Sequence, residues 1–408
     1  MDVQLGAGNY DLQKVIDLHR NGRLPLTIRA IPEGSVVNMG IPCIEVTATM
    51  PGFSWLVQWV ECMLQNNLWK PCNFATIGML YKQVAKKWYD KNSSGVNPAM
   101  AISDFGMRGM SCLEEATMCS AAWLLSFNKT STIPALPYID MYYNADCVGN
   151  NIGIGAVSTE HSVICANYAN DGDEITFLKK MLTEKYPNTS FSFLGDTYDY
   201  WNMVDNIFPA CKTEIMQHNG KILIRPDSGD MVPIAVKTVE KFWETFGGTV
   251  NDKGYKVLDQ HVGIIYGDGC TLYKVNKVWE ELDKLGFAAS NIVFGSGAFC
   301  FNSFPDEGNI KVNTRDVFGV AMKATYAETS TKSLPLFKDP KTDTTKLKKS
   351  HKGCIKVTKT ADGYVAVDGF MGMVHDADTE LKTVFADGVL VKDVTFTQVR
   401  ERLAEEMK

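Results

Sequence analysis

The chain has 408 residues, 45% of them hydrophobic, and a formal net charge of −6 at pH 7. A chain of this length can bury a large core, so we expect two domains or one barrel with a substantial outer layer. The negative net charge argues against an extended nucleic-acid-binding surface, because binding to a phosphate backbone normally needs an excess of lysine and arginine. No apolar stretch approaches the length of a membrane helix, and the first residues do not resemble a signal peptide.

The eleven cysteines are spread singly along the chain, from Cys43 to Cys354. They form no Cys-x-x-Cys pair and no zinc-type spacing with histidine. We therefore expect free thiols, a cytoplasmic location and no metal ion held by protein ligands.

The first hundred residues predict a mixture of short elements. A helix is expected over residues 11–20, followed by short strands separated by Pro-Glu-Gly and Gly-Ile-Pro turns, at residues 26–30, 35–37 and 44–47. An aromatic helical segment follows over residues 53–69. Its Trp55, Trp59, Cys62 and Met63 recur at helical spacing, which favours a core face or a subunit contact over a cofactor site.

The middle of the chain alternates strands and helices, as βαβ units do. Apolar strands are expected at residues 191–194, 222–224, 262–265 and 292–294, and helices at residues 232–246 and 275–285. The later helix carries an i, i+3, i+4, i+7 stripe, and Gly286 stands where a left-handed C-cap is expected. With about six such units, closure into a parallel barrel is favoured over an open sheet.

In the last part of the chain, the alternation of strands and helices gives way to a basic loop and hairpin signals. A basic loop, Lys346-Leu347-Lys348-Lys349, precedes two hairpin signals, Asp362-Gly363 and Asp387-Gly388. Thr397 is expected to cap a short C-terminal helix. The pattern therefore divides the chain into residues 1–100, an N-terminal mixed part; 101–329, an α/β barrel with the active site; and 330–408, antiparallel strands and a helix that join the outer domain.

Small polar clusters follow the apolar runs of the middle part. They read Ser103-Asp104-Phe105-Gly106, Thr159-Glu160-His161-Ser162, Gly195-Asp196-Thr197-Tyr198, Arg225-Pro226-Asp227-Ser228-Gly229, Gly267-Asp268-Gly269 and Gly295-Ser296-Gly297. Because the carboxyl ends of parallel strands meet on one face, these clusters are expected to line one pocket. Acids, an arginine, a histidine and glycines together suit a phosphorylated sugar.

Each cluster has a second interpretation. Asp196, Asp227 and Asp268 are placed to bind ribose hydroxyls or Mg²⁺, yet an acid in this position often only caps the next helix. Three acids in register favour the functional interpretation. A lone histidine such as His161 is usually structural, although neighbouring carboxylates make a catalytic role more credible. The Gly295-Ser296-Gly297 turn suits a phosphate-binding nest and a purely steric strand end equally well.

The clusters, in this order and spacing, resemble the nicotinamide phosphoribosyltransferases of the type II phosphoribosyltransferase family. The resemblance runs from about Leu24 to the C-terminus and includes Asp104-Phe105-Gly106-Met107-Arg108-Gly109 and Phe337-Lys338-Asp339-Pro340. It implies an α/β fold with an irregular parallel barrel and an outer mixed α+β domain built from the N- and C-terminal parts. It also implies a homodimer with active sites at the interface, which joins nicotinamide to phosphoribosyl pyrophosphate and gives nicotinamide mononucleotide (NMN) and pyrophosphate in NAD biosynthesis.

The resemblance also implies roles for residues. Phe105 would stack on the pyridine ring, and Arg108 would approach the phosphate. His161 would be phosphorylated by ATP and oriented by Asp196, with Mg²⁺ accompanying the diphosphate. Ribose contacts are implied for Arg225, Asp227, Gly267 and Asp268; phosphate contacts for Ser296, Gly297, Arg315 and Lys323; and pyrophosphate or nucleotide contacts for Lys338 and Lys346, for which a solvated surface is nearly as good an interpretation.

Two departures from the family pattern bear on substrate and activity. Ser131 stands where the nicotinamide-using enzymes have an Asp, and Ser can donate to a carboxylate as well as to an amide. Nicotinate is therefore the alternative base. The family's Asp-Ser-Tyr-Lys type segment has no counterpart before Leu24, which leaves a non-catalytic NMN- or phosphate-binding relative as a further alternative. The sequence has no P-loop and no strand-linked Gly-x-Gly-x-x-Gly motif.

Overall fold

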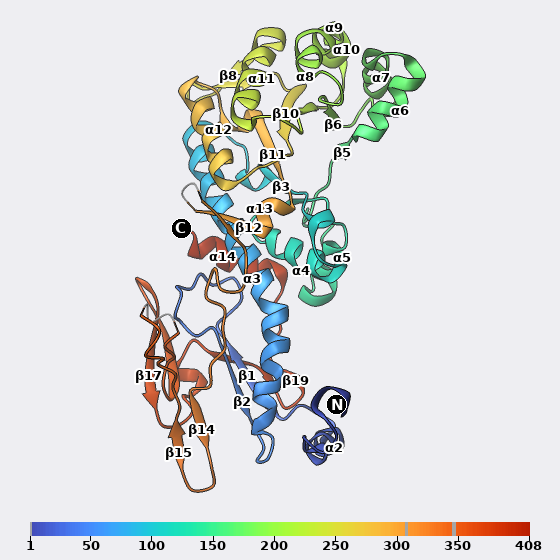
Figure 1. The fold of residues 1–408 in the computed structure, drawn as a ribbon. Helices are drawn as coiled ribbons and strands as arrows, with labels where there is room; N and C mark the ends of the chain where they lie inside the picture. Colours follow the sequence, from blue (N-terminus) through green and yellow to red (C-terminus); the bar gives the residue numbers. More distant parts are fainter. Residues whose placement is uncertain (1, 307–308, 345–347) are drawn as a thin grey trace. The chain divides into compact units, whose positions relative to one another are not determined.

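The computed structural model describes residues 2–306, 309–344 and 348–408. The chain divides into two compact units (Figure 1). The first unit consists of Met1–Lys70 together with Arg315–Lys408, and the second consists of Pro71–Thr314. The first unit thus draws on both ends of the chain, as expected for the outer mixed domain. The boundaries predicted at residues 100 and 329 stay predictions.

A seven-stranded parallel sheet forms the centre of the second unit, with the order β4-β3-β11-β10-β7-β6-β5. Its strands are β3 (Ile102–Asp104), β4 (Lys129–Thr130), β5 (Val157–Ser158), β6 (Phe191–Leu194), β7 (Ile222–Arg225), β10 (Val262–Tyr266) and β11 (Ile292–Ser296). The sheet curls into a half-barrel. A parallel bridge joins Lys129, in the edge strand β4, to Ile154, which lies just before the other edge strand β5. The predicted parallel α/β architecture is confirmed.

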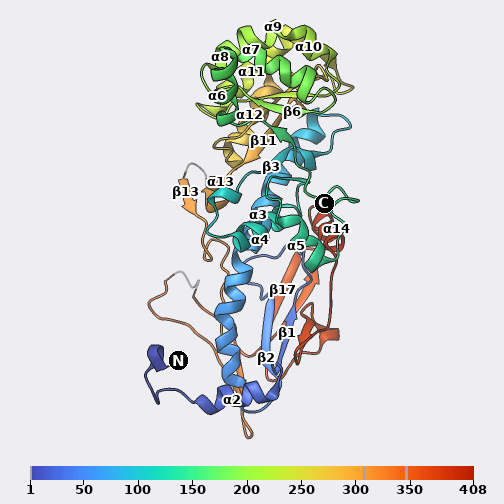
Figure 2. The same cartoon turned by 90° about the vertical axis from the view of Figure 1, so that its right-hand side faces the viewer.

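The central strands are buried because helices cover the outer face of the sheet while side chains fill its inner face. Every residue of β6 and β10 is buried. Figure 2 shows the helices from α6 to α12 gathered around the strands. The helices of this unit after the first strand are α4 (Leu113–Trp123), α5 (Ala135–Tyr143), α6 (His161–Asp171), α7 (Glu174–Lys180), α8 (Tyr200–Asn202), α9 (Phe208–Ala210), α10 (Lys212–Gln217), α11 (Met231–Phe246), α12 (Leu272–Lys284) and α13 (Ala298–Asn302).

Shorter elements connect these helices and strands. The one-turn helices and π-helical turns are η1 (Pro98–Met100), η2 (Met107–Gly109), η3 (Met181–Lys185), η4 (Met203–Ile207) and η5 (Ala289–Asn291). Two antiparallel pairs, β8 (Gly248–Val250) with β9 (Lys256–Leu258) and β12 (Ser303–Asp306) with β13 (Asn309–Val312), lie outside the main sheet.

Helix α12 confirms most of the predicted apolar stripe. Val275, Val278 and Trp279 are buried on the face that packs into the unit. Gly286 follows with φ +74, the left-handed conformation expected of a helix-ending glycine. Leu285, which the prediction placed in the stripe, instead follows the last helical residue and is 42% exposed.

Helix α3 (Ser54–Asn92) is 39 residues long and includes Pro71, so the predicted end near residue 69 is wrong. The helix continues because a second stripe, with Phe74, Ile77 and Tyr81, is buried in the core of the second unit. In its first half Trp59 is 57% exposed and Met63 67% exposed, and Cys62 is exposed. The core interpretation of that face is therefore wrong, and the subunit contact stays a prediction.

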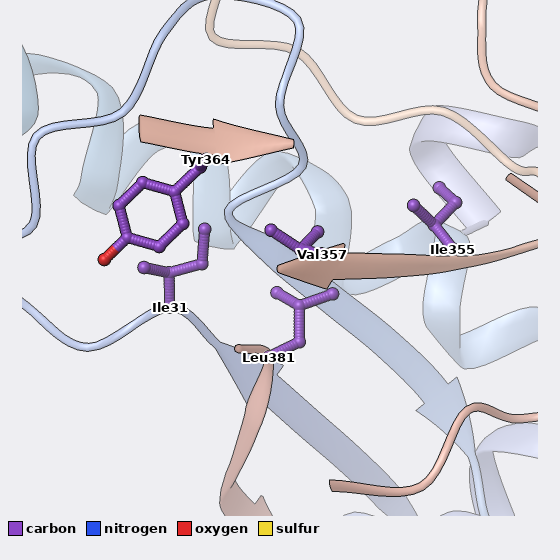
Figure 3. Packing of buried hydrophobic residues seen from close by; sticks show 5 residues of the cluster. All are labelled: Ile31, Ile355, Val357, Tyr364 and Leu381. Carbon is purple, nitrogen blue, oxygen red and sulfur yellow. The ribbon is translucent and has the colours of Figure 1, made fainter. Parts of the chain in front are cut away.

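The first unit contains a four-stranded antiparallel sheet and two further hairpins. The sheet runs β19 (Val389–Leu390), β18 (Lys382–Ala386), β1 (Leu26–Ala30), β2 (Ile44–Ala48), and the hairpins are β14 (Tyr326–Glu328) with β15 (Ser333–Pro335) and β16 (Cys354–Thr360) with β17 (Gly363–Phe370). Ile31, Ile355, Val357, Tyr364 and Leu381 form a buried apolar cluster that ties the two ends of the chain together (Figure 3). The two predicted hairpins are confirmed: Asp362-Gly363 lies at the turn between β16 and β17, and Asp387-Gly388 lies between β18 and β19.

The described residues of this unit also form the helices α1 (Asp2–Leu5), α2 (Leu12–Asn21) and α14 (Phe396–Glu406) and the one-turn helix η6 (Asp376–Asp378). Thr395 caps α14 through a reciprocal capping box with Gln398, so the predicted cap Thr397 is wrong. Residues 35–37, predicted as a strand, form a loop. No helix in the described part of the chain is long and apolar enough to cross a membrane. All eleven cysteines are free thiols.

Candidate active site

The carboxyl ends of the seven strands bring most of the predicted site residues to one end of the second unit. Parallel register pairs Ser296 with Asp104 and Leu194 with Arg225, so neighbouring strands stop side by side. The predicted residues that lie in or just after these strand ends are Phe105, Arg108, Ser131, His161, Asp196, Arg225, Asp227, Gly267, Asp268, Ser296 and Gly297. The sheet thus collects residues that span almost two hundred positions of sequence.

Arg225, the last residue of β7, is the electrostatic centre of this end of the sheet. Its side chain is 7% exposed, and it donates to Ser158 Oγ at 2.9 Å. One guanidinium nitrogen also lies 3.4 Å from Asp227 Oδ2 and 3.5 Å from Glu160 Oε2. Two carboxylates beside a buried arginine compensate the cost of its desolvation. The Nε atom of Arg225 is buried without a partner among the described residues, which leaves one donor for an acceptor group.

Gly267, the residue after β10, lies against this ion pair. A Cβ atom built on Gly267 would lie 2.6 Å from Asp227 Oδ1 and 3.8 Å from Arg225 Nε. A side chain of any size at this position would push Asp227 away from Arg225. The glycine is therefore needed for the close approach of two strand ends. Asp268, the next residue, is exposed.

Asp196 organises the loop that follows β7. Its Oδ2 atom accepts hydrogen bonds from the backbone N–H of Asp227 at 3.0 Å and from the hydroxyl of Ser228 at 2.5 Å. Its Oδ1 atom is buried and has no partner among the described residues. Asp196 therefore fixes Asp227, and its predicted role of orienting His161 stays a prediction.

His161, the first residue of α6, is exposed at the same end of the sheet. Its Nδ1 atom lies 3.0 Å from the hydroxyl of Thr197, so the partner that orients the ring here is the residue next to Asp196. When Nδ1 carries the proton and donates it to Thr197, the Nε2 atom holds a free lone pair. Such a ring nitrogen is a nucleophile and an acceptor of a transferred group.

Phe105 lies on the backbone of the neighbouring strand. A Cβ atom built on Gly295 would lie 2.0 Å from Cε2 of the Phe105 ring, and the backbone N–H of Phe105 donates to Ser296 O at 2.8 Å. The ring is partly exposed. Gly295 thus supports one side of a flat aromatic surface at the carboxyl end of the sheet.

Ser131 is exposed and follows the edge strand β4, where Asp104 holds its loop in place. The backbone N–H of Ser131 donates to Asp104 O at 2.8 Å. The Asp104 carboxylate, which is buried, accepts from Thr130 Oγ1 at 2.8 Å, Thr132 Oγ1 at 2.9 Å and the backbone N–H of Gly106 at 2.7 Å. Asp104 therefore ties the Phe105 loop to the Ser131 loop.

The turn after β11 combines a buried hydroxyl with an open backbone. Ser296 is fully buried, whereas a Cβ atom built on Gly297 would meet no atom within 4 Å. Beneath this turn, burial raises the pKa values of the Cys300 and Cys270 thiols. These thiols are therefore neutral, and they are not candidate nucleophiles.

The predicted cations fall into two groups. Arg108 is exposed in η2 of the second unit. Arg315, Lys323 and Lys338 belong to the first unit, where Arg315 donates to Gln65 Oε1 at 2.7 Å and the ammonium group of Lys323 donates to Met322 O at 2.9 Å. Lys338 is exposed, and Lys346 lies outside the described residues. The predicted roles of all five residues stay predictions.

Comparisons with known proteins identify relatives of this chain. The nicotinate phosphoribosyltransferase (NAPRTase) family model matches residues 100–389. The chain belongs to the NAPRTase family. A nicotinamide phosphoribosyltransferase from Acinetobacter baylyi is 35% identical over 100% of this chain and 82% of that protein. One from Mycoplasma pneumoniae is 30% identical over 81% of this chain and 71% of that protein. The crystal structure of human nicotinic acid phosphoribosyltransferase aligns with TM-score 0.49 and 14% identity, covering 99% of this chain and 81% of that chain.

Sequence reasoning missed several residues that shape this NAPRTase-family site. Ser158 and Glu160 contact Arg225, and Thr197 contacts the histidine ring. Thr197 and Glu160 lie within the polar clusters recognised in the sequence, so their position after a strand was an available signal. Ser158 lies inside a strand, and nothing in its sequence context indicated that its hydroxyl points to Arg225.

Proposed function

We propose that this chain is a nicotinamide phosphoribosyltransferase, which forms NMN and pyrophosphate from nicotinamide and phosphoribosyl pyrophosphate in NAD biosynthesis. The observation that carries the proposal is the set of contacts around the buried Arg225. Its guanidinium group contacts Ser158 and Asp227, and Gly267 lies beside them, so the carboxyl ends of β5, β7 and β10 meet here. An arginine with an unpartnered buried donor, next to a glycine and a carboxylate, suits a ribose phosphate. The relatives named nicotinamide phosphoribosyltransferase support the choice of base.

The transfer step needs alignment and electrostatic stabilisation more than a protein nucleophile. The pyridine nitrogen forms a bond to the anomeric carbon as the bond from that carbon to the diphosphate oxygen breaks. Positive charge builds up on the ribosyl centre, and the carboxylate of Asp227 would stabilise it. Basic groups would stabilise the negative charge of the leaving diphosphate. Phe105, supported by Gly295, would hold the flat ring in line.

We also propose that His161 couples ATP to this reaction. The Nε2 lone pair would form an N–P bond with the terminal phosphoryl group while the bond from that group to ADP breaks. The Thr197 hydroxyl, which can accept from Nδ1–H, would support the tautomer in which Nε2 is unprotonated. Transfer without ATP would remain possible, because His161 takes no part in the bond between pyridine and ribose.

Mg²⁺ would accompany the diphosphate rather than occupy a protein cage. Among the described residues no group of three or more His, Cys, Asp or Glu side chains could hold a metal ion. Phosphate oxygens with one or two carboxylates are sufficient for Mg²⁺, which keeps several of its water ligands. Asp196, with its unpartnered buried oxygen, is the carboxylate best placed for this at the strand ends.

Nicotinate is the second candidate base, and one observation favours it. Ser131 is exposed at the strand ends, and its hydroxyl can donate to a carboxylate as readily as to an amide. The proposal is completed by a cytoplasmic location, which the free cysteines favour, and by a homodimer, which the resemblance to the family implies. The exposed Trp59 and Met63 of α3 are the residues that we expect at a subunit contact.

Steady-state kinetics with the two bases tests the proposal. Purified protein with phosphoribosyl pyrophosphate and Mg²⁺ should show a higher kcat/KM for nicotinamide than for nicotinate, and ATP should stimulate NMN formation. The His161→Ala variant should lose the ATP stimulation and keep the slow basal transfer. A strong preference for nicotinate would refute the choice of base, and stimulation that survives in His161→Ala would refute the histidine role.

A further inference from the structure

A cavity lies at the end of the parallel sheet opposite to the candidate active site. Its volume is about 210 Å³, and it is lined by Lys129, Ser190, Lys221, Leu223, Gly263, Ile264, Ser290, Asn291 and Val293. Lys221 and Asn291 immediately precede strands β7 and β11, and Ser190 precedes β6. The cavity therefore opens at the amino ends of the strands, away from His161 and Arg225.

Two lysines line this cavity. Neither the Lys129 nor the Lys221 ammonium group has a hydrogen bond or an ion pair within the described residues, and the cavity lining contains no carboxylate. Burial lowers the pKa of both lysines, and the charge of Lys221 lowers the pKa of Lys129 further. Asp259 opposes the shift at Lys221 only in part, and its carboxylate is held by His261 at 2.6 Å.

The backbone is shaped to admit the Lys221 side chain. A Cβ atom built on Gly263 would lie 3.4 Å from Cδ of Lys221 and 2.9 Å from Cδ2 of Leu223. The lysine stem therefore crosses the strand at its glycine. Ser190 Oγ accepts the backbone N–H of Lys221 at 2.9 Å, which leaves its hydroxyl hydrogen available. The Asn291 side chain accepts from the backbone N–H of Leu258 and donates to Lys256 O, so it orders the wall of the cavity.

We propose that this cavity binds a phosphate-class oxyanion between Lys129 and Lys221. Two desolvated ammonium groups repel each other and lack partners, so a doubly charged anion that contacts both would relieve the repulsion and the desolvation cost together. A single carboxylate would neutralise only one of them. The hydroxyls of Ser190 and Ser290 add neutral donors for the remaining oxygens. Free inorganic phosphate and diphosphate both have this chemistry.

Nuclear magnetic resonance of the full chain with carbon-13 lysine tests this site apart from the strand-end site, because each lysine reports separately. Lys129→Met and Lys221→Met assign the two side-chain signals. Inorganic phosphate should shift both signals with one common dissociation constant, while sodium chloride at equal ionic strength should not. The Lys129→Met variant should weaken phosphate binding at Lys221 by about tenfold or more, since it removes one of two charged donors.

Lys185→Met, which changes an exposed lysine of the same unit, is the matched control and should leave both signals and their titration unchanged. A parallel titration with diphosphate shows whether the cavity prefers inorganic phosphate or diphosphate, because the preferred ligand has the lower dissociation constant. The proposal is overturned if chloride reproduces the shifts, or if the two lysines titrate independently and the loss of one leaves phosphate binding at the other unchanged. Loss of transferase activity in any of these variants is not required.

Discussion

The Nδ1 atom of His161 lies 3.0 Å from Oγ1 of Thr197, so the residues that follow β5 and β6 are joined by a side-chain hydrogen bond. This contact orients the ring of an exposed histidine, and when Nδ1 is the donor the opposite ring nitrogen holds a free lone pair. The Asp196 carboxylate next to Thr197 is occupied with Asp227 and Ser228. At the strand ends one residue therefore contacts the histidine ring, and its neighbour fixes the loop that follows β7.

The Thr197→Val substitution keeps the shape of the side chain and removes the hydroxyl. We expect the ATP-stimulated rate of NMN formation to fall about tenfold, which corresponds to the loss of one orienting hydrogen bond. The rate without ATP should stay unchanged. Thr197→Ser is the control, because it keeps the hydroxyl group and should keep most of the ATP stimulation. Equal loss of basal and stimulated rates in Thr197→Val would contradict the orienting role.

Arg225→Met should lower the free energy of unfolding by about 2 kcal/mol, because Asp227 and Glu160 lose their shared cation. The value lies below that of a fully buried pair because the Glu160 side chain is 55% exposed. Urea unfolding measures it, with Arg20→Met as the control, since the exposed Arg20–Asp17 pair is expected to contribute almost nothing. The kcat/KM for phosphoribosyl pyrophosphate should fall as well. An unchanged unfolding midpoint would mean that the network does not stabilise the fold.

Gly295→Ala and Gly297→Ala form a matched pair two residues apart. The first would place a methyl group 2.0 Å from the Phe105 ring and should destabilise the protein by about 1–3 kcal/mol. The second adds a methyl group to open space at φ −85 and should leave the thermal midpoint unchanged. If phosphate approaches the Gly297 backbone, this second variant should still raise the KM for phosphoribosyl pyrophosphate. An unchanged KM would remove Gly297 from the phosphate site.

Ser131→Asp tests base selection at the loop held by Asp104. A carboxylate at this position should repel nicotinate and still accept a hydrogen bond from the nicotinamide amide. We expect the ratio of kcat/KM for nicotinamide over nicotinate to rise by about tenfold or more, the equivalent of one unfavourable charge contact. Ser131→Ala is the control, because it removes the hydroxyl without adding charge. A ratio that does not change in Ser131→Asp would place the base elsewhere.

The Lys221→Met substitution has a stability effect with a defined pH dependence. Burial lowers the pKa of this lysine in the folded state below its usual 10.5, so the folded protein binds fewer protons than the unfolded chain as the pH rises towards 10.5. The lysine therefore destabilises the fold most at neutral pH, and less as it deprotonates. Without phosphate, Lys221→Met should be more stable than the wild type at pH 7, and its advantage should shrink towards pH 10.5. Urea unfolding at several pH values measures the difference.

The sequence predicted the parallel sheet well because its strands are short apolar runs with no competing pattern. Residues 191–194 form a strand with the predicted bounds, and the strands at 222–224, 262–265 and 292–294 extend by one or two residues. The same strand ends predicted which residues gather at the carboxyl edge of the sheet. Parallel register fixes that outcome, because each chain segment must leave the sheet at the same edge.

The contacts within the site were harder to predict because they depend on side-chain direction and on close backbone approach. The ring of Phe105 lies on Gly295, and Gly267 lies beside Asp227, in pairs of residues far apart in sequence. Predictions from the local sequence pattern were also wrong where tertiary packing determines the length of a helix or the burial of a side chain. Helix α3 continues through Pro71 because Phe74 and Ile77 are buried beyond it, and Trp59 is exposed although its spacing suggested a core face.

The central claim is that these strand ends form one site that joins a pyridine base to ribose phosphate. Phosphorus-31 nuclear magnetic resonance of the purified protein with nicotinamide, phosphoribosyl pyrophosphate and Mg²⁺ tests it most directly. The account predicts that NMN and pyrophosphate appear in equal amounts, only when both substrates are present, and far more slowly in Arg225→Met. Phosphoribosyl pyrophosphate that remains intact with either base, or NMN formed at the wild-type rate by Arg225→Met, would contradict it.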